Sequence, residues 1–117
     1  MRYMLLIYAN EAAIQADPKK VKTVSPAYVA YTNAIREAGI LLGGEPLQPT
    51  ANATTVRTRA GKTEVLGGPY AETREQLAGY YMIEAADLDA AISWAARCPG
   101  AENGTIEVRP LWEMQAS

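Results

Sequence analysis

Two glutamates that flank an arginine are the residues of this sequence best suited to acid–base chemistry. Glu72 and Glu75 stand three positions apart, with Arg74 between them. If this segment is one helical turn, both carboxyl groups lie on the same side of it. Two carboxyl groups in different surroundings can divide the roles of general acid and general base. The simpler interpretation is a solvated loop, or a cap in which Glu72 accepts bonds from free backbone N–H groups. The two glutamates are candidates for catalysis on this basis.

A glycine-rich turn comes directly before these glutamates. Gly67, Gly68 and Pro69 could bring backbone N–H groups close to a ligand, with Tyr70 and Arg74 following them. Turn chemistry offers a simpler interpretation, because glycine supplies a positive φ and proline fixes the exit from a hairpin. We therefore expect either a tight turn or one wall of a ligand pocket.

Charged and aromatic residues share faces of two expected strands. Glu107 and Arg109 share one face of the last strand, and Tyr80 and Glu84 share one face of the strand before it. If these faces line a chamber, Arg109 and Tyr80 could bind an anionic small molecule. A buried charge without a partner costs several kcal/mol, so Glu107 and Arg109 would then have to pair. A solvated outer face is the alternative. The same argument extends to two further residues, Tyr8 and Glu45.

Composition removes several classes of function. The 117 residues include no histidine and one cysteine, Cys98, which excludes histidine-based triads, an intrachain disulfide and a thiolate metal site. We expect neither a metal nor a cofactor, and a structural role for Cys98. The net charge is −2 and the basic residues are scattered, so a nucleic acid is not an expected partner.

The location and the domain count follow from length and hydropathy. No segment approaches the roughly 18 apolar residues that a membrane helix requires, and the apolar run near the N-terminus is too short for a secretory signal. We expect a cytoplasmic protein with no membrane partner. The length of 117 residues is that of one domain, here residues 1–117.

The elements that must position these side chains can be read from periodicity. Residues 3–8 and 79–84 are apolar on both faces and predict strands buried on both sides. Residues 10–24 are polar and irregular, and indicate a loop that includes a short helical turn. Ser25 and Pro26 predict a helix start, and Gly39 its end at Ala38. Its apolar stripe contains Ala27, Tyr31, Ala34, Ile35 and Ala38.

The rest of the chain completes an alternating pattern. Residues 40–47 predict a second strand, and residues 54–58 and 62–66 a hairpin around residues 59–61. Asp87 caps a second helix that ends before Pro99, and residues 105–109 form the last strand. The expected apolar stripe of that helix contains Leu88, Ala91, Ile92 and Ala95.

This order predicts a ferredoxin-like α+β fold, a β-α-β-β-α-β sheet with an extra β-hairpin and both helices on one face. The two strands that are apolar on both faces are expected at its centre. The other sheet face is then an exposed apolar surface of a size unusual for a monomer. A second copy packing sheet to sheet would cover it and form a dimeric α+β barrel.

The stretch from residue 66 to residue 81, LGGPYAETREQLAGYY, resembles the signature of the DGPF-motif branch of the YCII-related family. That signature is Asp-Gly-Pro-Phe, then Ala-Glu-Thr-Lys-Glu, then a glycine-aromatic strand. Further segments resemble the family at residues 4–8, 38–41, 44–49, 87–91 and 107–110. The resemblance implies the dimeric α+β barrel. It also implies a bacterial protein of unknown function, associated with operons of extracytoplasmic-function sigma factors.

The sequence departs from the motif where chemistry is implied. The wider group resembles small lactone isomerases, for which a His/Asp pair is the implied acid–base pair. Here Gly67 replaces the motif aspartate, Tyr70 replaces the phenylalanine, and histidine is absent. Two hypotheses remain open. One is a homodimer with a small-molecule pocket between the sheet and the motif loop, accessory to a regulatory operon. The other is a cofactor-independent isomerase or lyase acting on a lactone or carbonyl compound.

Overall fold

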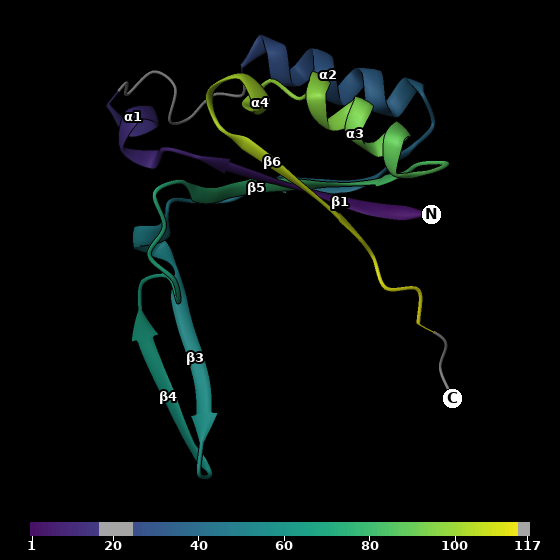
Figure 1. Ribbon diagram of the computed structural model, residues 1–117. Coiled ribbons are helices and arrows are strands. Elements are labelled where there is room, and N and C mark those ends of the chain that lie inside the picture. Colours follow the sequence, from purple (N-terminus) through teal and green to yellow (C-terminus); the bar gives the residue numbers. More distant parts are fainter. Residues whose placement is uncertain (17–24, 115–117) are drawn as a thin grey trace.

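The computed structural model describes residues 1–16 and 25–114 and has an antiparallel sheet as its main layer (Figure 1). Its four strands have the order β2-β5-β1-β6. They span Leu41–Pro46 (β2), Gln76–Glu84 (β5), Arg2–Ala9 (β1) and Thr105–Pro110 (β6). Two helices, Pro26–Glu37 (α2) and Leu88–Arg97 (α3), lie over one face. The predicted ferredoxin-like α+β arrangement is confirmed, with β1 and β5 at the centre.

The expected hairpin forms a separate two-stranded sheet. It consists of Thr54–Arg59 (β3) and Lys62–Gly67 (β4), and it points away from the helices (Figure 1). The two-residue turn at its tip has a positive φ at both Ala60 and Gly61, as tight hairpins require. The remaining elements are Glu11–Gln15 (α1), Thr50–Asn52 (η1) and Gly100–Asn103 (α4). Of the expected loop at residues 10–24, residues 17–24 lie outside the described part of the chain.

The core lies between the sheet and the two long helices. Along β1, Tyr3, Leu5 and Ile7 are buried, whereas Met4 and Leu6 on the other face are only partly covered. The buried side chains meet a cluster from β5, α2 and α3 that contains Ile83, Tyr31, Ile35, Ala91, Ala95 and Cys98. Strand alternation therefore gives β1 one face in the core and one apolar face outside it.

The helix α2 begins and ends as predicted. The Ser25 side chain accepts a hydrogen bond from the Tyr28 N–H at 3.2 Å, and Gly39 follows the last turn with a φ of +75°. Tyr31 and Ile35 of the expected apolar stripe are buried. Two alanines of that stripe are instead exposed, Ala27 and Ala38. Ala27 lies in the first turn of α2 and Ala38 is its C-cap, so both stand at the ends of the helix.

The expected apolar stripe of α3 is wrong at two positions. Ala91 and Ala95 are buried, but Leu88 and Ile92 are about half exposed. The buried stripe continues to Cys98 at the helix end. Short alanine side chains let α3 approach the sheet closely, so the longer residues remain at the border of the contact.

The strand expected from Gly79 begins three residues earlier, at Gln76. Gly79 lies opposite Ile7, but Leu77 lies opposite Tyr8, so Ala78 forms a bulge in β5. A bulge accommodates one extra residue and lets pairing continue past an irregular position. The segment before β5 is irregular rather than helical, so the one-turn helix considered for Glu72 and Glu75 is wrong.

Candidate functional site

The sheet face opposite the helices carries side chains in transverse rows, because directly opposed residues of an antiparallel sheet project to the same side. One row crosses all four strands and contains Glu45, Tyr80, Leu6 and Glu107. The next row contains Gly43, Met82, Met4 and Arg109. A third contains Leu77, Tyr8 and Thr105. We call the surface formed by these three rows the open face.

The open face has an apolar centre and polar edges. Met4, Leu6 and Met82 occupy the two central strands and are partly exposed. Both long helices lie on the opposite side of the sheet (Figure 1), and no helix of the described residues covers these side chains. Since large apolar patches are uncommon on monomers, this surface is a candidate for binding.

An ion pair stands at one edge of the open face. Arg109 Nη2 lies 2.5 Å from Glu107 Oε2, as expected for two charges that share a strand face. The guanidinium N–H is not directed at this oxygen, however. Among the described residues no group donates a hydrogen bond to Glu107 Oε2, although the atom itself is buried. We therefore treat the contact as electrostatic, with one carboxylate oxygen left open to a further donor.

The glycine-rich turn lies away from that edge, at the base of the hairpin. Gly67, Pro69 and Tyr70 border a hollow of about 230 Å³, together with Thr55, Arg57 and Leu66. The turn is fixed by two bonds. Gly68 N–H donates to the Ala53 carbonyl at 2.8 Å, and Thr55 Oγ1 donates to the Gly68 carbonyl at 2.8 Å. Gly68 has a φ of +97°, the positive φ that the turn interpretation of the sequence expects of a glycine.

The segment with the two glutamates connects the hairpin to β5. Glu72 and Arg74 are exposed, and the Arg74 carbonyl accepts a long bond from Gln76. Glu75 Oε1 accepts a hydrogen bond from Thr105 Oγ1 at 2.7 Å, which brings it to the end of the open face. The structure thus divides the candidate residues into three places. The hairpin base holds Gly67, Gly68, Pro69 and Tyr70, the connecting segment holds Glu72, Arg74 and Glu75, and the open face holds Tyr80 and Arg109.

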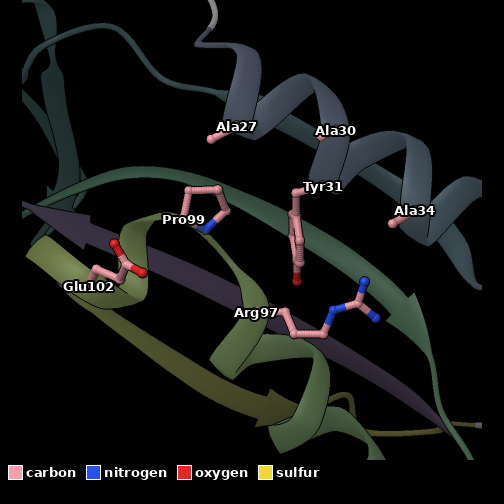
Figure 2. Close-up of a pocket in the computed structure, with 7 residues that line it drawn as sticks. All are labelled: Ala27, Ala30, Tyr31, Ala34, Arg97, Pro99 and Glu102. Atoms are coloured by element: carbon pink, nitrogen blue, oxygen red, sulfur yellow. The ribbon is translucent and has the colours of Figure 1, made fainter.

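A second hollow lies on the helix side and was not expected from the sequence. It is a groove of about 360 Å³ between α2 and the end of α3 with the segment that follows. Figure 2 shows the residues that line it, Ala27, Ala30, Tyr31, Ala34, Arg97, Pro99 and Glu102. The Tyr31 hydroxyl donates to the Trp94 carbonyl at 2.7 Å, and burial raises the pKa of Tyr31. The Arg97 guanidinium lies over the Trp94 ring, 4.3 Å from its centre. The Tyr31 hydroxyl and the Arg97 guanidinium are therefore already engaged in contacts with Trp94.

Sequence reasoning missed some residues of these sites. Thr55 and Arg57 border the hollow at the hairpin base because they share a strand face with Leu66. The positions of Thr55 and Arg57, two residues apart in the expected strand, indicate that they share a face. The hollow itself can be recognised only from the backbone of the turn. Trp94 is partly buried at the edge of the core.

Two structural findings concern membrane helices and metal sites. The described helices include none with the length and hydropathy needed to cross a membrane. Within residues 1–16 and 25–114, no group of three or more acidic, cysteine or histidine side chains is placed to hold a metal ion.

Comparison with known proteins gives three findings. The model of the YCII-related domain matches residues 1–115. An uncharacterized protein of Rhizobium meliloti (strain 1021) is 39% identical over 118 residues, covering 95% of this chain and 92% of that protein. A solved structure of similar fold is the 5-chloro-2-hydroxyhydroquinone dehydrochlorinase TftG from Burkholderia phenoliruptrix AC1100, in complex with 2,5-dihydroxybenzoquinone. The TM-score is 0.55 at 13% identity, over 96% of this chain and 94% of TftG.

Proposed function

Because this chain belongs to the YCII-related family, whose model matches nearly all of it, we propose that it is a small-molecule-binding homodimer. A second copy covers the open face, and the ligand occupies the chamber between the two sheets. The observation that carries this proposal is the apolar centre formed by Met4, Leu6 and Met82 on a sheet face that no described helix covers.

The size of the exposed surface supports a second copy. The chain exposes 8547 Å², whereas a compact monomer of 12.6 kDa is expected to expose roughly 6,200 Å². Its radius of gyration is 16.3 Å, against about 13 Å for a compact domain of this length. The difference in area exceeds the roughly 800 Å² per partner of a standard interface.

The chemistry of the open face suggests the kind of ligand. Its apolar centre would contact a flat or aliphatic body, and the Tyr80 hydroxyl would hydrogen-bond a polar substituent. Glu107 Oε2 could accept a further hydrogen bond, and Arg109 could contact an anionic group from its exposed side. A small oxygenated organic acid or phenol combines these features. Such a dimer would fit the accessory role in a regulatory operon that the motif resemblance implies.

Light scattering tests the dimer, with an open-face variant and a matched control. We expect the native chain to have twice the mass of 12.6 kDa. Leu6→Arg places a charge at the centre of the open face and is expected to give a monomer. Val29→Arg places the same charge at an exposed apolar residue of α2, so that variant is expected to remain a dimer. A native chain that stays monomeric at micromolar concentration contradicts the proposal.

The chamber is tested with 2,5-dihydroxybenzoquinone as a probe, because this flat, acidic ring has the size and polarity of the proposed ligand class. Calorimetry is expected to show binding to the native dimer and weaker binding to Tyr80→Phe. The Tyr70→Phe variant changes a tyrosine at the hairpin base and is expected to bind as the native chain does. Equal affinities for all three proteins would place the ligand site elsewhere, and a native dimer that does not bind the probe would contradict the proposed ligand class.

A second candidate function is catalysis without a cofactor, by an isomerase or lyase acting on a lactone or carbonyl compound. It is favoured by the buried Glu107 Oε2, which lies beside the Arg109 guanidinium but accepts no hydrogen bond from the described residues. Such an oxygen can take a proton from a bound substrate. TftG, a dehydrochlorinase, shows that a fold of this kind can support a reaction on a small ring compound. The test measures the incorporation of solvent deuterium into a small lactone. Incorporation that is lost in Glu107→Gln and retained in Tyr70→Phe would establish this function.

A further inference from the structure

The β3–β4 hairpin is an arm whose stability the chain itself does not explain. Its strands pair with each other as a sheet of two strands, and nearly all of its residues are exposed. An isolated hairpin is marginally stable at best in water. The arm therefore needs a contact beyond those made within the described residues.

The two faces of the arm differ in chemistry. Val56 and Val65 lie directly opposite each other and are 60% and 65% exposed. The other face carries an ion pair between Arg57 and Glu64, with 3.3 Å between Arg57 Nε and Glu64 Oε2, and has one exposed apolar residue, Leu66, near its base. A charged face is suited to water, whereas a bare pair of valines is suited to another protein surface.

Three hydrogen bonds connect the segment before the arm to the main sheet. The Glu11 carboxylate accepts bonds from Thr50 N–H at 2.8 Å and Thr50 Oγ1 at 2.7 Å, just before β3. The Gln76 side chain, at the start of β5, accepts a bond from Glu11 N–H at 3.0 Å. Figure 1 shows that the arm extends on the side of the sheet away from the helices. This is also the side of the open face.

The length of the arm decides what it reaches. Strands of six residues span roughly 20 Å, whereas packed sheets lie only about 10 Å apart. An arm on the open side is thus long enough to pass the whole thickness of a sheet packed on that face. A second copy packed on the open face would therefore lie within reach of the arm.

We propose that the arm of each copy packs its Val56–Val65 face against the other copy and closes one end of the chamber between the sheets. This inference rests on the proposed homodimer. It adds a second contact between the two copies, besides the contact of their open faces. Each chamber is then incomplete without a segment of the opposite subunit. The apolar valine pair identifies the occupant as protein surface, and the continuity of the arm with the open face identifies it as the second copy.

The first test compares the dimer dissociation constants of two double variants. Val56→Ser with Val65→Ser removes the apolar face of the arm and is expected to raise the constant at least about tenfold. Val29→Ser with Ile92→Ser is the matched control, since these exposed residues are 48% and 49% exposed and lie on the helices. The control is expected to dimerise like the native chain. Equal dissociation constants for both double variants would overturn the inference.

Hydrogen–deuterium exchange separates a failure of this inference from a failure of the dimer. The amides of residues 54–67 are expected to be protected in the native dimer. They are expected to exchange like those of a free hairpin in Leu6→Arg, the expected monomer. If the native chain is a dimer by light scattering but these amides exchange as in the monomer, the arm does not pack on the second copy. In that case the homodimer of the proposed function still stands.

Discussion

Arg109 Nη2 lies 2.5 Å from Glu107 Oε2, two residues away on β6, on the sheet face that also carries Met4 and Leu6. In the single chain this pair is largely accessible, with 68% of the Arg109 side chain and 40% of the Glu107 side chain exposed. Exposed pairs contribute little, about 0–1 kcal/mol. The stability of this pair therefore reports whether a second copy covers the open face.

A double-mutant cycle on this pair is the first prediction. If the second copy buries it, Arg109→Met or Glu107→Gln alone is expected to cost the dimer about 3 kcal/mol, because each leaves an uncompensated charge. The double variant is expected to recover most of that loss. Urea unfolding of the dimer at several protein concentrations measures all four proteins. Four stabilities within about 1 kcal/mol of each other would show a pair in water.

Gly104 provides a test of the fold at the start of β6. A Cβ built on Gly104 lies 2.2 Å from the Tyr8 carbonyl oxygen and 3.1 Å from that of Gly100. Neither contact is with a flexible side-chain end, so Gly104→Ala is expected to destabilise the chain by at least about 2 kcal/mol. The midpoint of thermal unfolding would fall by roughly 10 °C.

Gly67→Asp is the matched control for Gly104→Ala. A Cβ at Gly67 meets no atom within 4 Å, and this substitution restores the aspartate of the family motif. The unfolding free energy is expected to stay within about 0.5 kcal/mol of the native value. A large loss for Gly67→Asp, or none for Gly104→Ala, would mean that the backbone at these turns differs from the one described.

The third prediction concerns the reactivity of Cys98. Its side chain is 1% exposed, its Sγ lies 3.8 Å from the Tyr28 hydroxyl, and burial raises its pKa. Thiolate is the reactive form, so Ellman's reagent at pH 8 is expected to label the native protein only as fast as it unfolds. The chain in guanidinium chloride is expected to release one equivalent at once. Rapid labelling of the native protein would refute the buried, structural role.

Local signals in the sequence were sufficient for the elements of the fold. Ser25 caps the start of α2, and Gly39, in the left-handed conformation, ends it. Both effects depend only on residues nearby in the sequence. The alternation of Glu107 and Arg109 gave their shared face correctly, because a strand has a period of two. The same local rules predicted the hairpin with its connection at residues 59–61, of which Ala60 and Gly61 form the turn.

Features that depend on distant contacts could not be predicted in this way. The buried stripe of α3 is set by how closely Ala91 and Ala95 approach the sheet, which periodicity alone does not show. The early start of β5 depends on a bulge that matches Leu77 to Tyr8 of β1. The separation of Tyr70 from Tyr80 and Arg109 depends on how the arm leaves the sheet, where Glu11 contacts Thr50 from elsewhere in the chain.

The most direct test of the central claim is the oxidation of the four methionines by hydrogen peroxide, followed by peptide mass spectrometry. Met4 and Met82 lie on the open face, whereas Met1 and Met114 are 53% and 80% exposed elsewhere and serve as internal controls. If a second copy covers the open face, Met4 and Met82 of the native protein oxidise much more slowly than Met1 and Met114. They also oxidise much faster in Leu6→Arg. Rates for Met4 and Met82 that are the same in both proteins would contradict the claim.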